Sequence, residues 1–356
     1  MTTNDVKFTI SDKIKEYLVP LNGQILFDEL ADGYLRKAGI YDILHGVPVP
    51  IRVDAEQGLT TLTIALGMAA VLGADPEFRY REAYLAYIRK LFGNGFTRIL
   101  LSEGAKAGGE GRFEEACVWF RAALLLEPLQ RDALYLYGRA CKDAYEQEGR
   151  PEDYVGNFKA QSIELFEVLT MAHPDDAIGY YFLGYSYANL GLYVKAKLTW
   201  EDFLRLSERE EEASAEETPV AGQLAAIPAE EMQNMREEVR ERLRRLEDPV
   251  VIENGINHIL SGDYQGGRAI LEPYTEGPYQ QWWPLWYYLG IAAASLGDTD
   301  EASADLRQAL RLSPSNIEVM RELVEISRAA GDLVTAEKYE SKIRVVQQSM
   351  LAEQED

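Results

Sequence analysis

The sequence predicts an all-α protein built from antiparallel helix hairpins, and a repeated pattern carries this prediction. Residues 177–206 place the small residues Gly184 and Ala196 where two helices would approach each other closely, with large apolar and aromatic side chains around them. A similar pattern returns at residues 283–316, around Gly290. One such hairpin cannot bury its apolar face alone, so neighbouring hairpins must stack on it. We therefore expect a solenoid of repeats through most of the chain.

The small residue at the helix-packing position recurs along the chain and gives the register of the repeats. It is found at Gly67, Gly104, Gly138, Gly184, Gly255 and Gly290, with Val324 at the last place. Four of the six intervals lie near 34 residues. The first long interval predicts an insertion near residues 145–158. The second predicts a segment at 208–217 that is too acidic to form a packed helix, followed by an extra amphipathic helix at 229–247.

The hairpin at 177–206 resembles a tetratricopeptide repeat (TPR). The matching residues are Tyr180, Leu183, Gly184, Tyr187, Gly191, Tyr193, Ala196 and Trp200. The resemblance extends over about residues 60–343 and implies a TPR-type right-handed superhelical solenoid of about six hairpins. The predicted organisation is an N-terminal helical cap or docking segment (1–59), a first TPR block (60–207), an acidic linker with the extra helix (208–247), a second TPR block (248–343) and a C-terminal tail (344–356).

The first sixty residues do not follow the repeat. Residues 23–39 show apolar side chains at helical spacing, and Gly39 is placed to end that helix. The segment VPVPIR at 47–52 must be extended, because each proline disfavours the helical conformation of the residue before it. Asp54 and Gln57 look like a capping pair that opens the next helix. We expect a helical cap on the solenoid, with a docking arm for a partner as the alternative.

Composition limits the classes of partner. The chain of 356 residues is 47% hydrophobic and has a formal net charge of −23. Such a charge repels nucleic acid and anionic lipid, and favours a basic protein partner. No apolar run at the N-terminus resembles a signal peptide, so we expect a cytoplasmic protein. The cysteines, Cys117 and Cys141, fall at helix-packing positions, which favours packing over a disulfide or redox pair.

The sequence offers little for catalysis or for a cofactor. His45, His173 and His258 share no metal-ligand spacing, and His258 is expected to pack inside a hairpin. The glycine-rich stretch at 104–111 lacks the Gly-Lys-Ser/Thr of a phosphate loop. No carboxylate pair has surroundings that would separate its pKa values, as acid/base catalysis requires. We predict no catalytic residues, no cofactor and no metal.

In the TPR family the first helix of each hairpin lines the concave face and supplies most partner contacts. Carried over to this sequence, the candidate partner-binding residues are Tyr135, Arg139, Lys142, Tyr181, Tyr185, Ile256, Tyr287 and Ile291. They would form a partly aromatic groove that suits an amphipathic helix or an extended apolar segment. The alternative is that the extra helix, or packing between the repeats, fills this groove. Trp282 and Trp283 would indicate a further interface if they were exposed.

The resemblance therefore implies a non-enzymatic scaffold or adaptor that holds a protein or peptide partner. The alternative within the family is a chaperone-like protein that shields an apolar segment of a secreted or assembling subunit. The rival from another class is an enzyme with a site in the N-terminal region. A homo-oligomer is compatible with all three.

Overall fold

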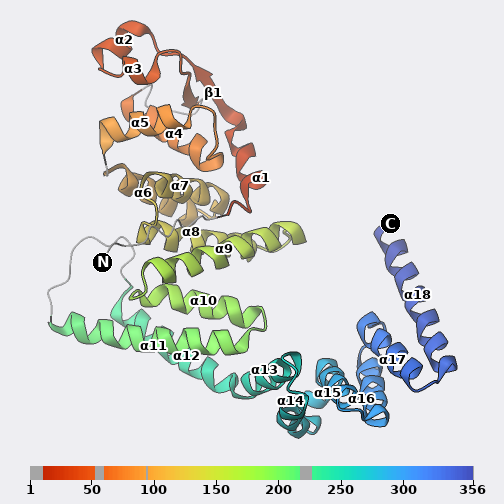
Figure 1. The fold of residues 1–356 in the computed structure, drawn as a ribbon. Coiled ribbons are helices and arrows are strands. Elements are labelled where there is room, and N and C mark those ends of the chain that lie inside the picture. The colour runs from red at the N-terminus through yellow and green to blue at the C-terminus, as the bar shows by residue number, and fades with distance from the viewer. Residues whose placement is uncertain (1–10, 53–59, 94, 217–226, 356) are drawn as a thin grey trace. The chain divides into compact units, whose positions relative to one another are not determined.

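A computed structural model describes residues 11–52, 60–93, 95–216 and 227–355 (Figure 1). The chain forms two compact units. The first comprises Met1–Asn189 with Leu198–Val239, and the second comprises Leu190–Lys197 with Arg240–Asp356. In the described residues the fold is helical apart from one two-stranded sheet, which confirms the predicted all-α class.

Within the described residues, six helix pairs form hairpins of the kind that the period predicts. They are α6 (Gly95–Gly109) with α7 (Phe113–Leu126), α8 (Arg131–Tyr145) with α9 (Glu152–Ala172), α10 (Ala177–Asn189) with α11 (Tyr193–Glu216), α13 (Glu247–Leu260) with α14 (Tyr264–Leu271), α15 (Trp283–Ser295) with α16 (Thr299–Leu312), and α17 (Ile317–Ala329) with α18 (Leu333–Glu355). Consecutive hairpins stack through α7 on α8 and α9 on α10 in the first unit. In the second unit they stack through α14 on α15 and α16 on α17.

The predicted small residues mark the points of closest helix approach. A Cβ atom on Gly184 would lie 2.3 Å from Nε1 of Trp200 on α11, and one on Gly290 would lie 2.7 Å from Leu306 on α16. Gly104, Gly138 and Gly255 meet second-helix side chains in the same way. Real Cβ atoms do not come this close to other atoms, so only glycine fits at this helix separation.

The first predicted repeat packs differently. Helix α4 (Thr61–Ala74) is buried on several sides, as expected for a helix that is apolar all round. A Cβ atom on Gly67 would meet Pro50 at 3.1 Å, rather than a residue of α5 (Arg81–Phe92). The close approach to a following helix is made by Gly73, against the backbone of Val118 on α7. The assignment of Gly67 to the repeat register is therefore wrong.

The N-terminal segment is only partly helical. Strand β1 (Ile25–Asp28) pairs antiparallel with β2 (Val49–Arg52), so the predicted helix at 23–39 is reduced to α2 (Asp32–Lys37). The cause is the extended, proline-containing segment, whose backbone offers a pairing edge to the β-favouring residues of β1. Gly39 does end α2, with a φ of +66°.

Five further short elements are described beside this hairpin or between repeats. They are α1 (Lys15–Leu18) with the 3-10 helix η1 (Val19–Gln24), α3 (Tyr41–Leu44), and the 3-10 helices η2 (Glu272–Thr275) and η3 (Pro278–Gln281). The predicted capping pair Asp54 and Gln57 lies outside the described residues. Helix α4 is instead capped by Thr60, whose hydroxyl accepts from the backbone N–H of Thr63 at 3.1 Å.

The insertion near 145–158 mainly lengthens α9, which begins at Glu152. The added turns of α9 contact residues of the N-terminal segment that precede η1. The ring of Tyr17 contacts those of Tyr154 and Phe158, with centroids 5.0 and 5.6 Å apart. Farther along α9, the Gln161 side-chain carbonyl accepts from the backbone N–H of Lys13 at 3.0 Å. The insertion therefore binds the N-terminal segment to the second repeat.

The acidic segment is helical as far as it is described. Helix α11 continues to Glu216, so the predicted linker at 208–217 is wrong over this stretch. Glutamate and alanine are strong helix formers, and their helix propensity does not require a packed face. The extra helix is α12 (Ala229–Arg245), close to its predicted bounds. The first unit ends at Val239 and the second unit resumes at Arg240, both within α12.

Candidate functional site: the first-helix faces and helix α12

In the first unit, α8 and α10 carry five of the predicted partner-binding residues. Tyr135 is buried, and its hydroxyl accepts from Nη1 of Arg139 at 3.1 Å. The Arg139 guanidinium also lies over the ring of Phe182 on α10, 5.3 Å from its centroid. Lys142 pairs with Glu146 one turn later, at 2.5 Å. Tyr135 and Arg139 thus join the two first helices to each other, and Lys142 is the most peripheral of the three.

Tyr181 and Tyr185 lie one turn apart on α10 and form an aromatic cluster. Their ring centroids are 5.1 Å apart in an edge-to-face arrangement. Tyr181 also contacts Phe203, at 5.3 Å, and Tyr185 contacts Trp200, at 4.9 Å. The rings are half-buried, so they support the hairpin core as well as presenting their hydroxyls outward.

Both hydroxyls donate to a single carboxylate on the extra helix. Tyr181 donates to Oε2 of Glu238 at 3.0 Å, and Tyr185 donates to Oε1 of the same side chain. Burial and the hydrogen bond to Glu238 raise the pKa of Tyr185 well above its usual range. The Tyr185 phenol is therefore a neutral donor at physiological pH.

Helix α12 is held against the first unit by a narrow set of further contacts. Met235, Arg236 and Val239 are its buried residues. Nη1 of Arg236 donates to the backbone carbonyl of Ser207 on α11 at 3.1 Å. The same guanidinium donates through Nη2 to the side chain of Gln233 at 2.9 Å. The predicted alternative, in which the extra helix covers the face, is therefore what the structure shows for Tyr181 and Tyr185.

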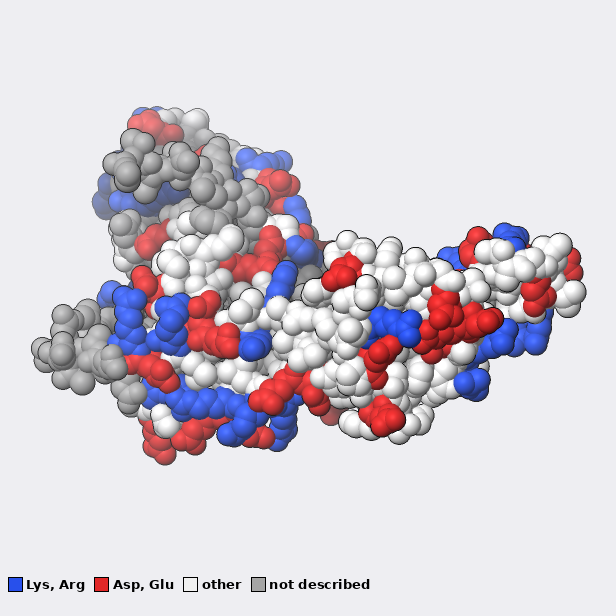
Figure 2. All heavy atoms as spheres, turned by 60° about the horizontal axis from the view of Figure 1, so that its bottom comes forward, with Lys and Arg blue, Asp and Glu red and all other residues white. Residues whose placement is uncertain are grey.

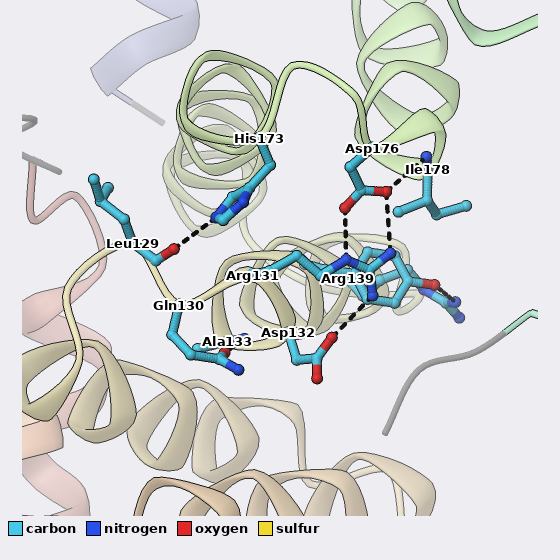
Figure 3. Close-up of polar contacts among 10 residues, drawn as sticks. Leu129, Gln130, Arg131, Asp132, Ala133, Arg139, His173, Asp176 and Ile178 are labelled. Atoms are coloured by element: carbon cyan, nitrogen blue, oxygen red, sulfur yellow. Dashed lines mark hydrogen bonds and ion pairs between the residues drawn. The ribbon is translucent and has the colours of Figure 1, made fainter. Parts of the chain in front are cut away.

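A polar junction fixes α8 and α10 relative to each other (Figure 3). Arg131, at the start of α8, forms a two-point ion pair with Asp176, with distances of 2.5 and 3.0 Å. Asp176 also accepts from the backbone N–H of Ile178 at 3.2 Å, at the start of α10. Nε2 of His173 donates to the carbonyl of Leu129 at 2.7 Å. This junction orients the two first helices that carry the tyrosine and arginine side chains.

In the second unit, the predicted isoleucines are covered in part by their own hairpins. Ile256 and Ile291 are half-buried and pack on a cluster that contains Ile252, Leu271 and Leu285. That the extra helix fills the groove at these isoleucines stays a prediction. Helix α12 does contact the tyrosine pair, through Glu238.

Tyr287 on α15, which is also a predicted partner-binding residue, has both aromatic and acidic neighbours. Its ring contacts Trp283 and Tyr288, with centroids 6.0 and 5.3 Å away. Burial, followed by the negative charges of Glu322 and Glu318 on α17, raises the pKa of Tyr287 to about 12. Aromatic and acidic side chains thus lie next to each other on this first-helix face.

The remaining candidate residues have local roles. Cys117 and Cys141 are buried free thiols with their Sγ atoms 3.7 Å apart, in keeping with the packing prediction. His258 is exposed and bonds Asp263 at 2.8 Å, so the prediction that it packs inside a hairpin is wrong. Trp282 is exposed, whereas Trp283 packs against the core of the last two hairpins.

No group of three or more His, Cys, Asp or Glu side chains in the described ranges could hold a metal ion. None of the helices described is both long and apolar enough to cross a membrane.

Sequence reasoning did not identify Glu238, Glu318 or Glu322 as parts of these faces. In the sequence Glu238 is half of a helical ion pair on a solvated face. No local pattern distinguishes it from the other carboxylates of an acidic chain. Its role depends on which helix lies opposite, which only the folded chain shows.

The sequence of the α15–α16 hairpin matches a known repeat family. Residues 283–316 match the family model described as a tetratricopeptide repeat. Residues 283–316 therefore form a tetratricopeptide repeat. The five other hairpins have the same two-helix form, and glycines at four of their first helices lie against the second helix as in the matched repeat.

Several solved structures resemble this chain at low identity. A MamA fragment from Desulfovibrio magneticus RS-1 is 13% identical, covering 71% of this chain and 96% of its own, with a TM-score of 0.26. The TPR domain of P58(IPK) is 12% identical, covering 83% and 76%, with a TM-score of 0.41. PilW, a type IV pilus biogenesis factor, is 12% identical, covering 72% and 98%, with a TM-score of 0.32. With scores this low, none bears on the function. No curated protein matches the sequence.

Proposed function

We propose that the protein is a non-enzymatic scaffold that holds a protein partner on the faces of its first helices. The observation that carries the proposal is that one such face already holds a helix. Tyr181 and Tyr185 lie outside the packing signature of their repeat, and both hydroxyls meet a carboxylate of α12, which belongs to no hairpin. A surface that binds a helix from outside its own hairpins in this way suits recognition of a partner helix in a groove.

The second unit supplies a face of different chemistry. Tyr287 and Tyr288 lie close to the carboxylates of Glu318 and Glu322 on α17. Burial, with the neighbouring charges of Glu325 and Glu318, raises the pKa of Glu322. A cationic side chain placed here would relieve the repulsion among the carboxylates and could stack on the tyrosine rings. This face therefore fits a basic or amphipathic segment of the partner.

The net charge alone does not define such a face. On the side of the molecule drawn in Figure 2, acidic and basic side chains lie in separate neighbouring clusters with uncharged surface between clusters. Specific recognition by one face is therefore more consistent with this surface than general attraction of any basic protein.

Site-specific photo-crosslinking in the native cell tests the proposal. A benzoyl-phenylalanine replaces Tyr287 on α15 or Arg321 on α17, both on first helices. A matched control carries it at Arg307, which is exposed on the second helix α16. We expect the same protein adduct from both first-helix positions and none from Arg307. Adducts of equal yield at all three positions, or none at the first-helix positions, would refute the scaffold function.

A charge variant tests the acidic character of this face. Glu322→Gln removes one carboxylate with little change of shape, and we expect it to weaken the adduct formed from Tyr287. Glu337→Gln on α18 is the control, because it removes the same charge from another helix. Equal adduct yields in the two variants would contradict recognition through the acidic face.

A further inference from the structure

Helix α12 is packed less extensively than the repeat helix α8. Its buried residues are Met235, Arg236 and Val239, which form one short stripe. Helix α8, by contrast, is buried along its whole length from Asp132 to Ala144. A helix with few buried apolar contacts opens at lower free energy than the core around it. Helix α12 is therefore better suited than α8 to leave its position.

The contacts that do hold α12 are directional and specific. The face offers two phenolic O–H donors, from Tyr181 and Tyr185, and one backbone carbonyl acceptor, from Ser207. Helix α12 supplies the matching groups, which are the carboxylate of Glu238 and the guanidinium of Arg236. Hydrogen bonds to charged groups are stronger than neutral ones and depend more on geometry.

The spacing of these groups defines a recognition pattern. Two residues separate Met235 from Glu238, and the buried Val239 follows directly. A helix that enters this site therefore needs apolar side chains one turn apart, a guanidinium next to the first, and a carboxylate just before the second. The Arg139 guanidinium on α8 lies close enough to Glu231 to interact with its charge, so an acidic residue at the helix start also fits.

We infer that this face recognises an amphipathic helix of a partner protein, and that α12 is its resident, displaceable occupant. The inference rests on the proposed scaffold function in one respect, namely that the partner is a protein. A partner helix with the same carboxylate and apolar stripe takes the place of α12 on the tyrosine pair. Because α12 is part of the same chain, it competes at an effective concentration of about millimolar. Free access to the face therefore requires a partner that binds more tightly, or a change that weakens α12.

A synthetic helix provides the test. A fluorescein-labelled peptide of residues 229–245 is titrated against the full chain and followed by anisotropy. In the variant Glu238→Lys with Val239→Asp, the resident helix loses its acceptor and its buried apolar contact. We expect the peptide to bind this variant at least ten-fold more tightly than it binds the wild-type chain, in which α12 competes. Circular dichroism checks that the variant remains folded.

Two controls locate the binding. A peptide with the Glu238→Gln change should bind the same variant about ten-fold or more weakly, since the amide is a poorer acceptor than the carboxylate. Adding Tyr181→Phe and Tyr185→Phe to the variant should weaken the wild-type peptide to a similar degree, because the rings stay and only the hydroxyls are lost. Equal peptide affinity for the wild-type chain and the folded variant, or no effect of the Phe changes, overturns the inference.

Hydrogen exchange of the wild-type chain covers the case in which the variant does not fold. We expect the amides of α12 between Met235 and Val239 to exchange at least a hundred-fold faster than those of α8. Exchange of α12 at the rate of α8 would show that it opens only with the whole unit, and would overturn the inference. The peptide and exchange experiments use only this chain, so their outcome is independent of the cellular crosslinking that tests the scaffold function.

Discussion

Replacing Gly184 by alanine tests whether the approach of α10 to α11 sets the geometry of the tyrosine face. The new Cβ atom would lie 2.3 Å from Nε1 and 2.4 Å from Cδ1 of Trp200. The indole is buried and cannot swing into solvent. It also donates from Nε1 to the backbone carbonyl of Tyr181 at 3.2 Å, and this bond would be strained or broken. The substitution therefore acts on the core and on the site together.

The magnitude follows from three opposing effects. Overpacking of a filled core costs about 1–3 kcal/mol. Loss of the indole hydrogen bond, with its buried donor left unpaired, costs about 1–3 kcal/mol. Alanine within a helix is favoured over glycine by about 1 kcal/mol, which offsets part of this. We expect Gly184→Ala to lower the free energy of unfolding by about 3 kcal/mol.

Gly156→Ala is the matched control. It is also a glycine within a helix, α9, but it is exposed and a Cβ atom there would meet nothing within 4 Å. It should raise stability by about 1 kcal/mol through helix propensity alone. Urea unfolding followed by circular dichroism compares the two variants. An unfolding midpoint of Gly184→Ala at or above that of Gly156→Ala would refute the assignment of Gly184 as the point of closest approach.

Three further predictions concern electrostatics and capping. Burial, followed by the charge of Glu301, raises the pKa of Asp305 to about 6, so the folded state holds this proton more tightly than the unfolded state. The free energy of unfolding should therefore fall as the pH rises from about 4 to 6. In urea unfolding, Asp305→Asn should be more stable than wild type by about 2 kcal/mol or less at pH 8, and equally stable at pH 4. Asp176→Ala leaves Arg131 without its two-point partner and should cost about 2–4 kcal/mol in the same assay; a cost below about 0.5 kcal/mol would contradict the junction. Thr60→Ala removes the cap of α4 and should lower stability by about 1 kcal/mol, whereas Thr60→Ser should be nearly neutral.

The hairpins could be predicted from the sequence because their packing is local and periodic. A glycine must recur wherever two helix backbones approach, and large side chains must surround it, so the pattern at Gly184 and Gly290 repeats at Gly104 and Gly138. The same reasoning fails for Gly67, because its neighbour is a strand from outside the repeat. A small residue indicates a close contact between elements, but it does not indicate which element makes that contact.

The corrections in the N-terminal and acidic segments have related causes. Residues of β1 show helical spacing of apolar groups, but the extended strand at Val49–Arg52 pairs with them and decides the outcome. The acidic run up to Glu216 has no apolar face, yet helix propensity continues α11 through it. In the first case a distant partner overrides local pattern, and in the second local propensity acts without any partner.

The same distinction between local pattern and distant contact applies to the candidate site. The positions of Tyr181, Tyr185 and Tyr287 on first helices follow from the repeat register. Which of these side chains remain available does not, because it depends on what folds back against them. Ile256 and Ile291 pack in part against the core of their own hairpins. The hydroxyls of Tyr181 and Tyr185 donate to Glu238 of α12.

The sequence by itself therefore determined the repeat, its period and the faces that could bind a partner, since these follow from spacing along single helices. The tertiary structure alone decided that α12 lies on the tyrosine pair and that acidic side chains of α17 flank Tyr287. Both contacts join residues about thirty or more positions apart, and their free energies depend on distances and burial that no local pattern contains.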